Sequence, residues 1–240
     1  MPKHGKNYRN AVEKIETARE YEPKEAISLI KEIAYAKFDE TIELHIRTGL
    51  DTRHADQQLR GTIVLPHGLG KGQRVVVFAE GEAARVAANA GADEVGGDDL
   101  VAKVEGGYVD FEIALATKEM MGKVGKLGRV LGPRGLMPNP RTNTVVDAQD
   151  LPKAIKDSKQ GRVEFRTDRT NLVHCPIGKT SFSEEALGDN LAALIAAILR
   201  EKPSGSKGQY LKTMTLTSTM GPGVPLDVAA TSGMGAAVAA

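Results

Sequence analysis

Residues 74–117 read RVVVFAEGEAARVAANAGADEVGGDDLVAKVEGGYVDFEIALAT, and this stretch decides the fold of the middle of the chain. Short runs of β-branched and aromatic residues alternate along it with segments that have helical spacing of apolar residues. The expected elements are a strand at Arg74–Glu80, a helix at Glu82–Ala90, a strand at Ala92–Val95, a helix at Asp98–Val104 and a strand at Phe111–Ala116. This alternation predicts βαβ units around a parallel sheet, here a small Rossmann-like three-layer α/β domain.

The next segment, Met120–Arg141, is rich in glycine, proline and cations. It holds five glycines, three prolines and five basic residues, and no acidic residue occurs between Met120 and Val146. Its cations are Lys123, Lys126, Arg129, Arg134 and Arg141. Cations without a nearby counter-charge favour a polyanionic partner, and glycines let another backbone approach closely. The ordinary alternative is a tight interdomain or hinge loop with solvated cations, and the residues leave both interpretations open.

On both sides of this region the apolar period changes to two, which is typical of strands with one buried and one wet face. In Thr41–Arg47 isoleucine and leucine alternate with polar residues, and Gly61–Leu65 is a second apolar strand. Arg162–Asp168 and Leu172–Cys175 alternate in the same way, and we expect them to pair as antiparallel neighbours. In Thr213–Thr219 every second residue is threonine, which predicts a face rich in hydroxyls.

Helical spacing of apolar residues accompanies these strands. Helices are expected at Asn10–Arg19 and Pro23–Ala34, before the first strand, and at Leu151–Lys159. A long apolar helix is expected at Glu184–Arg200, with Ser183 as its N-cap. The two flanks of the middle domain therefore share one pattern of strands with covering helices.

This shared pattern predicts a discontinuous two-layer α+β domain, formed by residues 1–66 and 161–223. The Rossmann-like domain, residues 67–160, is inserted into it, and the two crossings between the domains would act as a hinge. Residues 224–240 are poor in charge and lack a periodic pattern, so we expect a disordered tail.

The composition excludes several classes of protein. Lys and Arg number 32 against 31 Asp and Glu, so the chain lacks the strong positive charge of domains that coat nucleic acid nonspecifically. A single cysteine, Cys175, excludes an intrachain disulfide framework, and no apolar run approaches the roughly 20 residues of a membrane helix. The basic N-terminus has no apolar segment behind it and does not resemble a secretory signal. We expect a soluble, cytoplasmic protein without a membrane partner.

The Rossmann-like pattern raises the alternative of an α/β nucleotide- or ligand-binding enzyme, but the motifs for it are weak. The glycine string at residues 68–72 lacks the spacing and hydroxyl of a P-loop and the third glycine of a dinucleotide fingerprint. His174 and Cys175 are strand neighbours that point to opposite faces, so they cannot share a proton. The five histidines show no metal-ligand spacing. We predict no catalytic residue, no metal and no cofactor.

Two apolar residues, Phe38 and Met220, lie where strands with a wet face are expected to begin or end. Taken singly, each could be an ordinary core residue. Their joint position beside hydroxyls and turn residues instead favours packing on a ribose or a base. For Glu43, Glu164 and Asp168, a solvated or salt-bridged surface is the simpler interpretation.

Six separated motifs give the chain a family resemblance. They are KFDET at 37–41, LPHGLGK at 65–71, GADEVGG at 91–97, KLGRVLGPRGLMPNP at 126–140, GRVEFRTD at 161–168 and TSTMGPG at 217–223. In this order they resemble the bacterial form of the ribosomal protein L1 family, from about Tyr8 to Gly223. The resemblance implies a two-domain protein with an inserted Rossmann-like domain, located on the mobile stalk of the large ribosomal subunit beside the exit site. It implies no enzymatic activity.

By this resemblance the discontinuous domain binds large-subunit ribosomal RNA through its wet strand face. It also represses translation by binding a similar site on the messenger RNA of its own operon. The implied contact residues are Lys37, Phe38, Thr41, Arg166, Asp168, His174, Thr213, Thr219, Met220 and Gly221. Hydroxyls and the Gly221 backbone suit ribose 2′-OH groups and phosphates, which predicts readout of RNA shape with a shallow salt dependence.

The role of the basic cations in Met120–Arg141 stays open under the same resemblance. They would contact transfer RNA leaving the exit site, contact a second stretch of ribosomal RNA, or only brace the hinge. Two rival functions also stay open. One is the α/β enzyme or ligand-binding protein, and the other is a free-standing regulator of messenger RNA without a place on the ribosome.

The chain departs from the family pattern at residues 141–145, which read RTNTV where the family usually has a lysine and then a glycine before Thr-Val. Asn143 can occupy the left-handed turn that a glycine would take. We therefore expect the fold to persist through this departure.

Overall fold

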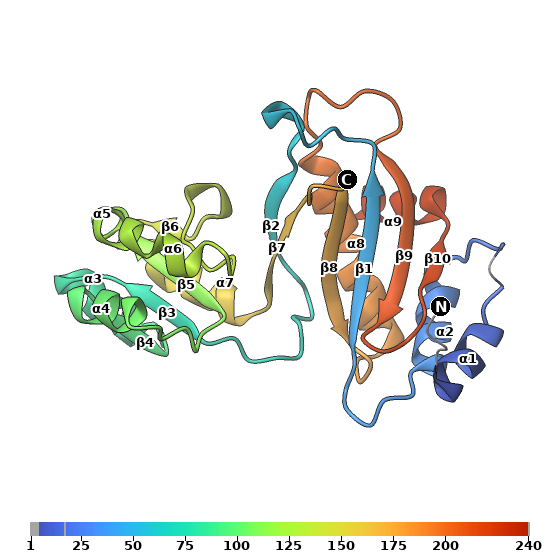
Figure 1. The fold of residues 1–240 in the computed structure, drawn as a ribbon, viewed down its shortest axis with the longest axis horizontal. Helices are drawn as coiled ribbons and strands as arrows, with labels where there is room; N and C mark the ends of the chain where they lie inside the picture. Colours follow the sequence, from blue (N-terminus) through green and yellow to red (C-terminus); the bar gives the residue numbers. More distant parts are fainter. Residues whose placement is uncertain (1–4, 17, 240) are drawn as a thin grey trace. The chain divides into compact units, whose positions relative to one another are not determined.

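The computed structural model describes residues 5–16 and 18–239, and at residues 55, 141, 238 and 239 it describes the backbone alone. Residues 1–4, Thr17 of the first expected helix and Ala240 of the expected tail lie outside the described residues. The chain forms two compact units, which are coloured along the sequence in Figure 1. Unit 1 comprises Met1–Gly70 and Val163–Ala240, and unit 2 comprises Lys71–Arg162.

Unit 2 is built on a parallel sheet. Its strands are β3 (Val75–Phe78), β4 (Glu94–Gly96), β5 (Ile113–Thr117) and β6 (Val145–Val146), and they lie in the order β4–β3–β5–β6. The helices are α3 (Gly81–Asn89), α4 (Asp98–Glu105), α5 (Met121–Val124), α6 (Gly128–Leu131) and α7 (Leu151–Lys159). Strand β6 was not predicted, because a strand of two residues carries no period.

Helices cover both faces of this sheet. Val75 and Val77 of β3 pack with residues of α3 and α7, whereas Val76 and Phe78 pack with residues of α4, α5 and α6. Burial on both sides explains why β3 is continuously apolar rather than alternating. The predicted Rossmann-like three-layer α/β fold is confirmed.

The glycine- and proline-rich segment begins as a series of short helical turns. The 3₁₀ turn η2 (Gly125–Leu127) joins α5 to α6, and a second 3₁₀ turn, η3 (Pro140–Thr142), follows the loop. Val124, Leu127 and Leu131 are buried against the sheet, so three apolar side chains at helical spacing anchor the segment. Asn143 has a φ of 48°, which confirms that it takes the left-handed conformation predicted for the departure from the family pattern.

Unit 1 contains a four-stranded antiparallel sheet. Its strands are β1 (Thr41–Thr48), β8 (Leu172–Lys179), β9 (Leu211–Ser218) and β10 (Val224–Leu226), in the order β10–β9–β1–β8. The helices of this unit are α1 (Lys6–Glu13), α2 (Pro23–Ile33), α8 (Glu184–Arg200) and α9 (Val228–Ala239). Helices α2 and α8 cover one face of the sheet, and Figure 1 shows α8 behind β8 and β1. This is the predicted two-layer α+β arrangement.

Two details of unit 1 follow from local sequence. The hydroxyl of Ser183 accepts a hydrogen bond from the backbone N–H of Ala186 at 3.2 Å, which confirms Ser183 as the N-cap of α8. The first helix was predicted at Asn10–Arg19 but lies at Lys6–Glu13. The backbone N–H of Glu16 instead donates to the Tyr21 hydroxyl at 2.8 Å, outside any helix.

The predicted pairing of Arg162–Asp168 with Leu172–Cys175 is wrong. Strand β7 (Arg162–Arg166) pairs with β2 (Arg60–Val64), which follows the 3₁₀ turn η1 (Ala55–Gln57), in a separate two-stranded sheet. A single bridge between Thr167 and Val173 joins β7 to β8. The Asp168 carboxylate accepts hydrogen bonds from the N–H groups of Thr170 and Leu172, both at 2.8 Å. This turn redirects the chain from one sheet to the other.

The expectation of a disordered tail is also wrong. Residues 224–226 form the edge strand β10, and α9 packs along α8. A Cβ atom at Gly235 would lie 2.5 Å from Ile195 Cγ2 and 2.9 Å from the Ala196 nitrogen, so the glycine permits a very close approach of the two helices. The small residues that suggested disorder therefore serve as a packing surface. Among the described residues, no helix has the length and apolarity needed to cross a bilayer.

Candidate nucleic-acid interface

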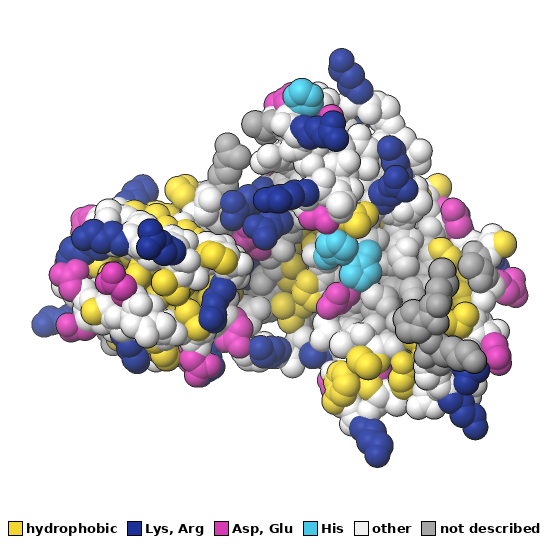
Figure 2. Space-filling model, in the orientation of Figure 1, with side chains coloured by type: hydrophobic (Ala, Val, Ile, Leu, Met, Phe, Trp, Pro, Cys, Tyr) yellow, Lys and Arg dark blue, Asp and Glu magenta, His cyan; other side chains and the backbone are white. Residues whose placement is uncertain are grey.

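The face of the four-stranded sheet that the helices leave uncovered, here called the open face, carries a matched set of polar side chains. Strand alternation places Ile42, Leu44 and Ile46 in the core, and the intervening residues of β1 point to the other side. The register sets these residues opposite polar neighbours: Thr41 faces Lys179, Glu43 faces Thr217, His45 faces His174 and Thr215, and Arg47 faces Thr213. Figure 2 shows histidine side chains over the middle of this face, with acidic side chains beside them.

One end of the open face carries two exposed apolar side chains. Phe38 is 55% exposed in the loop before β1, and Met220 is 50% exposed in the loop after β9. Neither residue is part of the core, so the alternative that Phe38 and Met220 are ordinary core residues is wrong. Large apolar side chains at this exposure are candidates for contact with a partner. Lys37, beside Phe38, is exposed, and it has no ion-pair partner among the described residues.

Hydrogen bonds tie these two loops together. The Thr219 hydroxyl accepts from the Thr41 backbone N–H at 2.9 Å and donates to the Thr41 carbonyl at 3.3 Å. The Thr41 hydroxyl in turn accepts from Lys179 Nζ at 2.8 Å. The structure thus brings Thr41, Thr219, Met220 and Gly221 to one edge with Phe38, and it commits the Thr219 hydroxyl to holding β1.

The middle of the open face is a pair of histidines. His45 Nδ1 and His174 Nδ1 lie 2.6 Å apart, and the rings meet edge to face with centroids 4.8 Å apart. One imidazole must donate and the other accept, so the pair accommodates one shared proton far more readily than two charges. Carboxylates flank both ends: Glu43 lies 3.8 Å from His45 Nε2, and Asp168 lies 3.8 Å from His174 Nε2.

This geometry makes folding stability sensitive to acid. Burial lowers the pKa of His45, the facing His174 lowers it further, and Glu43 opposes both effects only in part. Because the pKa is depressed in the folded state, the unfolded chain binds the proton first as the pH falls below the ordinary value of 6.5. The contribution to stability is therefore intact above that value and is lost below it.

We expect His45→Asn to reduce the loss of unfolding free energy between about pH 7.5 and about pH 5.5. Denaturant unfolding at the two pH values measures this loss. The control is His54→Asn, because His54 is exposed and lies outside the pair. An equal loss in His45→Asn and in the unsubstituted protein would contradict the assignment.

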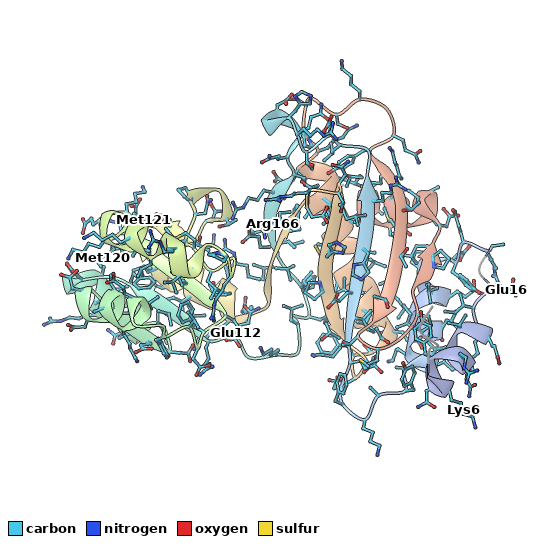
Figure 3. All side chains as sticks on the ribbon, viewed as in Figure 1. Lys6, Glu16, Glu112, Met120, Met121 and Arg166 are labelled. Atoms are coloured by element: carbon cyan, nitrogen blue, oxygen red, sulfur yellow. The ribbon has the colours of Figure 1, made fainter. Side chains whose placement is uncertain are left out.

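The remaining predicted contact residues are spread over other parts of unit 1. Thr213 lies opposite Arg47, toward the end of the open face away from Met220. Asp168 lies in the turn after β7, where burial acts to raise its pKa, but hydrogen bonds from Thr170 and Leu172 outweigh burial and hold the pKa below its ordinary value. Arg166 is on β7 and not on the four-stranded sheet, as Figure 3 shows. Arg166 is exposed and has no ion-pair partner among the described residues.

Sequence reasoning recognised the wet face of β1 but chose only Thr41 from it. His45, Arg47 and Thr217 share that face with the predicted residues, and strand alternation was the signal that could have included them. Tyr35 and the buried Glu40 were missed for a different reason, because their contacts with Met220 join segments far apart in sequence. Glu164 pairs with Arg60 at 2.9 Å, as the salt-bridge interpretation predicted.

One cation of the basic segment of unit 2, residues 120–141, is neutralised by acidic residues that are distant in sequence. Lys123 forms ion pairs with Glu80 at 2.7 Å and with Asp98 at 2.8 Å, so the expectation that it lacks a counter-charge is wrong. Both acids lie at the N-terminal ends of helices of the same unit: Glu80 is the N-cap residue of α3, and Asp98 is the first residue of α4. Lys126, Arg129 and Arg134 are exposed and form no ion pair within the described part of the chain. The side chain of Arg141 lies outside the described residues.

The same ion pairs bear on the nucleotide-binding alternative. A doubly wound sheet binds a nucleotide phosphate at the carboxyl ends of its strands, beside a helix N-terminus. Here Glu80 follows β3, Asp98 opens α4, and a Cβ atom at Gly97 would lie 2.7 Å from a Glu80 carboxylate oxygen. Carboxylates at this edge disfavour an anionic ligand.

Cys175 does not support a thiol chemistry. Burial raises the pKa of its thiol to about 12, with a smaller contribution from Glu43. A buried, protonated thiol is a poor nucleophile. Within the described residues, no group of three or more His, Cys, Asp and Glu side chains is arranged to hold a metal ion.

Comparison with known proteins gives a consistent result over nearly the whole chain. Residues 30–222 match the family model described as the ribosomal protein L1p/L10e family. The large ribosomal subunit protein uL1 of Chloroflexus aggregans is 56% identical over 231 residues, which is 96% of this chain and 98% of that protein. The protein of the same name from Thermomicrobium roseum is 56% identical over 232 residues, 96% of each chain. That from Dehalococcoides mccartyi strain BAV1 is 54% identical over 235 residues, 98% of this chain and 99% of that protein. The chain therefore belongs to the ribosomal protein L1p/L10e family.

Proposed function

We propose that this protein is a structural component of the large ribosomal subunit in the cytoplasm, where it binds ribosomal RNA through the open face of unit 1. The observation that carries the proposal is the exposed pair Phe38 and Met220 at the end of a face lined with threonines and histidines. The names of the relatives place those proteins in the large subunit. These names support a structural role for this chain rather than an enzymatic one.

The chemistry of the open face fits folded RNA. Apolar side chains can stack on bases or sugars, and hydroxyls can bond ribose 2′-OH groups, so the face recognises shape more than sequence. Among the described residues, few cations without an ion pair lie on or beside it: Arg47 is exposed on β1, Lys179 lies opposite Thr41 on β8, and Lys37 is exposed in the adjoining loop. A small number of neutralised phosphates gives a shallow dependence of affinity on salt.

Filter binding to a folded fragment of large-subunit ribosomal RNA tests this proposal across a salt series. We expect tight binding to the folded fragment, weak binding to an unrelated RNA of equal length, and a slope of about −2 to −3 in the logarithm of affinity against the logarithm of salt. Equal affinity for both RNAs, or a slope near −8, would contradict recognition through the open face. Sedimentation with large subunits separates this role from that of a free-standing regulator of messenger RNA.

Repression of its own operon follows from the same face. A messenger RNA segment that folds like the ribosomal site would compete for Phe38 and Met220, so free protein would block translation when ribosomal RNA is limiting. A translational reporter carrying the operon leader tests this role. The proposal requires that substitutions of Met220 relieve repression in parallel with their effect on binding to ribosomal RNA.

The basic segment of unit 2 is proposed to contact the transfer RNA that leaves the exit site. Its support is the set of exposed cations Lys126, Arg129 and Arg134, which form no ion pair with the residues that the structure describes. In ribosomes carrying Arg129→Glu and Arg134→Glu, release of deacylated transfer RNA should change, whereas Arg85→Glu on α3 should leave it unchanged. Unchanged release with the paired substitutions would contradict this contact and leave only a structural role for the segment.

A further inference from the structure

Two side chains form hydrogen bonds with the backbone of Met220, one with its N–H and one with its carbonyl. Its N–H donates to Glu40 Oε2 at 3.0 Å, and its carbonyl accepts from the Tyr35 hydroxyl at 2.6 Å. Both partners come from the segment between α2 and β1, which lies about 180 residues away in sequence. A residue held at both its N–H and its carbonyl has a fixed backbone position, which sets the direction in which its side chain leaves the loop.

Glu40 is the buried centre of this arrangement. Glu40 is only 1% exposed. Its Oε1 accepts a hydrogen bond from the Ala36 N–H at 2.9 Å, and its Oε2 accepts one from the Met220 N–H. Burial acts to raise the pKa of Glu40, but hydrogen bonds from the backbone, among them those from the Met220 and Ala36 N–H groups, lower it below its ordinary value. The group is therefore an ionised carboxylate that joins the Phe38 loop to the Met220 loop.

The neighbouring residue fastens the other side of the Phe38 loop. The Asp39 carboxylate accepts from the hydroxyl of Thr180 at 2.9 Å, and from the N–H and hydroxyl of Ser181 at 3.0 and 2.8 Å. Phe38 therefore lies in a loop that is held at two places: Asp39 bonds it to the loop of Thr180 and Ser181, and Glu40 bonds it to the Met220 loop. A loop fixed in this way loses little backbone conformational entropy when its exposed apolar side chains bind a partner.

We propose that Glu40 and Tyr35 are positioning residues that clamp the Met220 backbone, so that Phe38 and Met220 form one preorganised apolar contact for RNA. This inference rests on the proposed RNA-binding function and adds the means by which the contact is held. Neither side chain needs to touch RNA. Glu40 is buried, and the Tyr35 hydroxyl is occupied by the Met220 carbonyl.

The carboxylate matters because the groups around it are donors. Glu40→Gln keeps the size of the side chain but replaces one acceptor oxygen with a donor NH₂, which faces an N–H and cannot bond to it. One of the two hydrogen bonds, from Ala36 or from Met220, is then lost, which loosens the link between the two loops. We expect affinity for the folded ribosomal RNA fragment to fall about tenfold, and Tyr35→Phe, which removes one neutral hydrogen bond, to reduce it about threefold.

A double-mutant cycle with Met220→Ala tests whether these residues act through Met220. If the clamp is correct, Glu40→Gln weakens binding about tenfold alone but less than about twofold in the Met220→Ala background. Asp227→Asn is the control, because Asp227 caps α9 through the N–H groups of Ala229 and Ala230 and is remote from Met220 in the fold. It should lower stability without changing affinity. All affinities are measured on variants shown to be folded by thermal unfolding.

Each outcome of the cycle decides the matter. Unchanged affinity in Glu40→Gln, or a loss that persists in full in the Met220→Ala background, would overturn the clamp and leave the proposed RNA site standing. If Met220→Ala itself binds normally, the RNA site fails and the clamp fails with it. Should Glu40→Gln not fold, the same cycle with Tyr35→Phe decides, because that change removes only the hydroxyl that bonds the Met220 carbonyl.

Discussion

Met220→Asp should weaken binding to the folded ribosomal RNA fragment by about 100-fold or more. Packing of a side chain on a base or sugar contributes on the order of 1–3 kcal/mol. A carboxylate at the same place removes that packing and adds repulsion from the phosphates. Met220 is half exposed at the end of the open face, so the substitution places the new charge against the partner rather than in the core. Filter binding at fixed salt measures the change.

The matched control is Val12→Asp. Val12 is a partly exposed apolar residue of unit 1 on α1, 38% exposed, and its replacement introduces the same charge away from the open face. Its affinity should lie within about twofold of the unsubstituted protein. If both variants lose affinity equally, added negative charge alone explains the result and Met220 has no special position.

Asn190→Leu should destabilise unit 1 by about 3–5 kcal/mol, the largest effect on folding that we expect from a single substitution. The buried amide of Asn190 accepts from the His67 N–H at 3.0 Å and donates to the carbonyls of Gly68 and Ile177 at 3.0 and 2.8 Å. It therefore fastens the glycine-rich connector to β8. Leucine has the same branching as asparagine but leaves three backbone groups without partners. Denaturant unfolding measures the loss.

Asp189→Ala, at the preceding position of α8, is the control for this substitution. Asp189 is exposed, and its carboxylate forms a hydrogen bond with His67 Nε2 at 2.9 Å. An exposed side-chain contact of this kind contributes at most about 1 kcal/mol, so the control should stay within that range. A loss for Asn190→Leu no larger than that of the control would show that water replaces the missing hydrogen bonds.

The sequence predicted well those elements in which a pattern of apolar residues continues over several positions and in which one face or both faces are buried. The alternation in Thr41–Arg47 identifies β1 and its open face, and the continuous apolar run in β3 identifies a strand covered on both sides. The pairing of β7 with β2 could not be read in the same way. Periodicity gives the faces of a strand but not its partner, and here a side-chain turn at Asp168 decides the partner.

The candidate site was predictable to the extent that its residues are local. Phe38 and Met220 stood out because each lies at the end of a strand beside hydroxyls and turn residues. The pairing of Lys123 with Glu80 and Asp98, and the contact of Glu40 with Met220, depend on segments brought together only by the fold. Charge patterning in sequence therefore overstated the freedom of Lys123 and missed the function of Glu40.

The location of the RNA site can be measured by hydroxyl-radical oxidation of the protein, free and bound to the folded ribosomal RNA fragment, with mass spectrometry of each methionine and phenylalanine peptide. Met234 of α9 on the helical side of unit 1 is the internal reference. We predict that RNA protects Met220 and Phe38 from oxidation and leaves Met234 unchanged. Equal oxidation of Met220 in both states, with protection of the Met120–Arg141 segment instead, would contradict RNA binding through the open face.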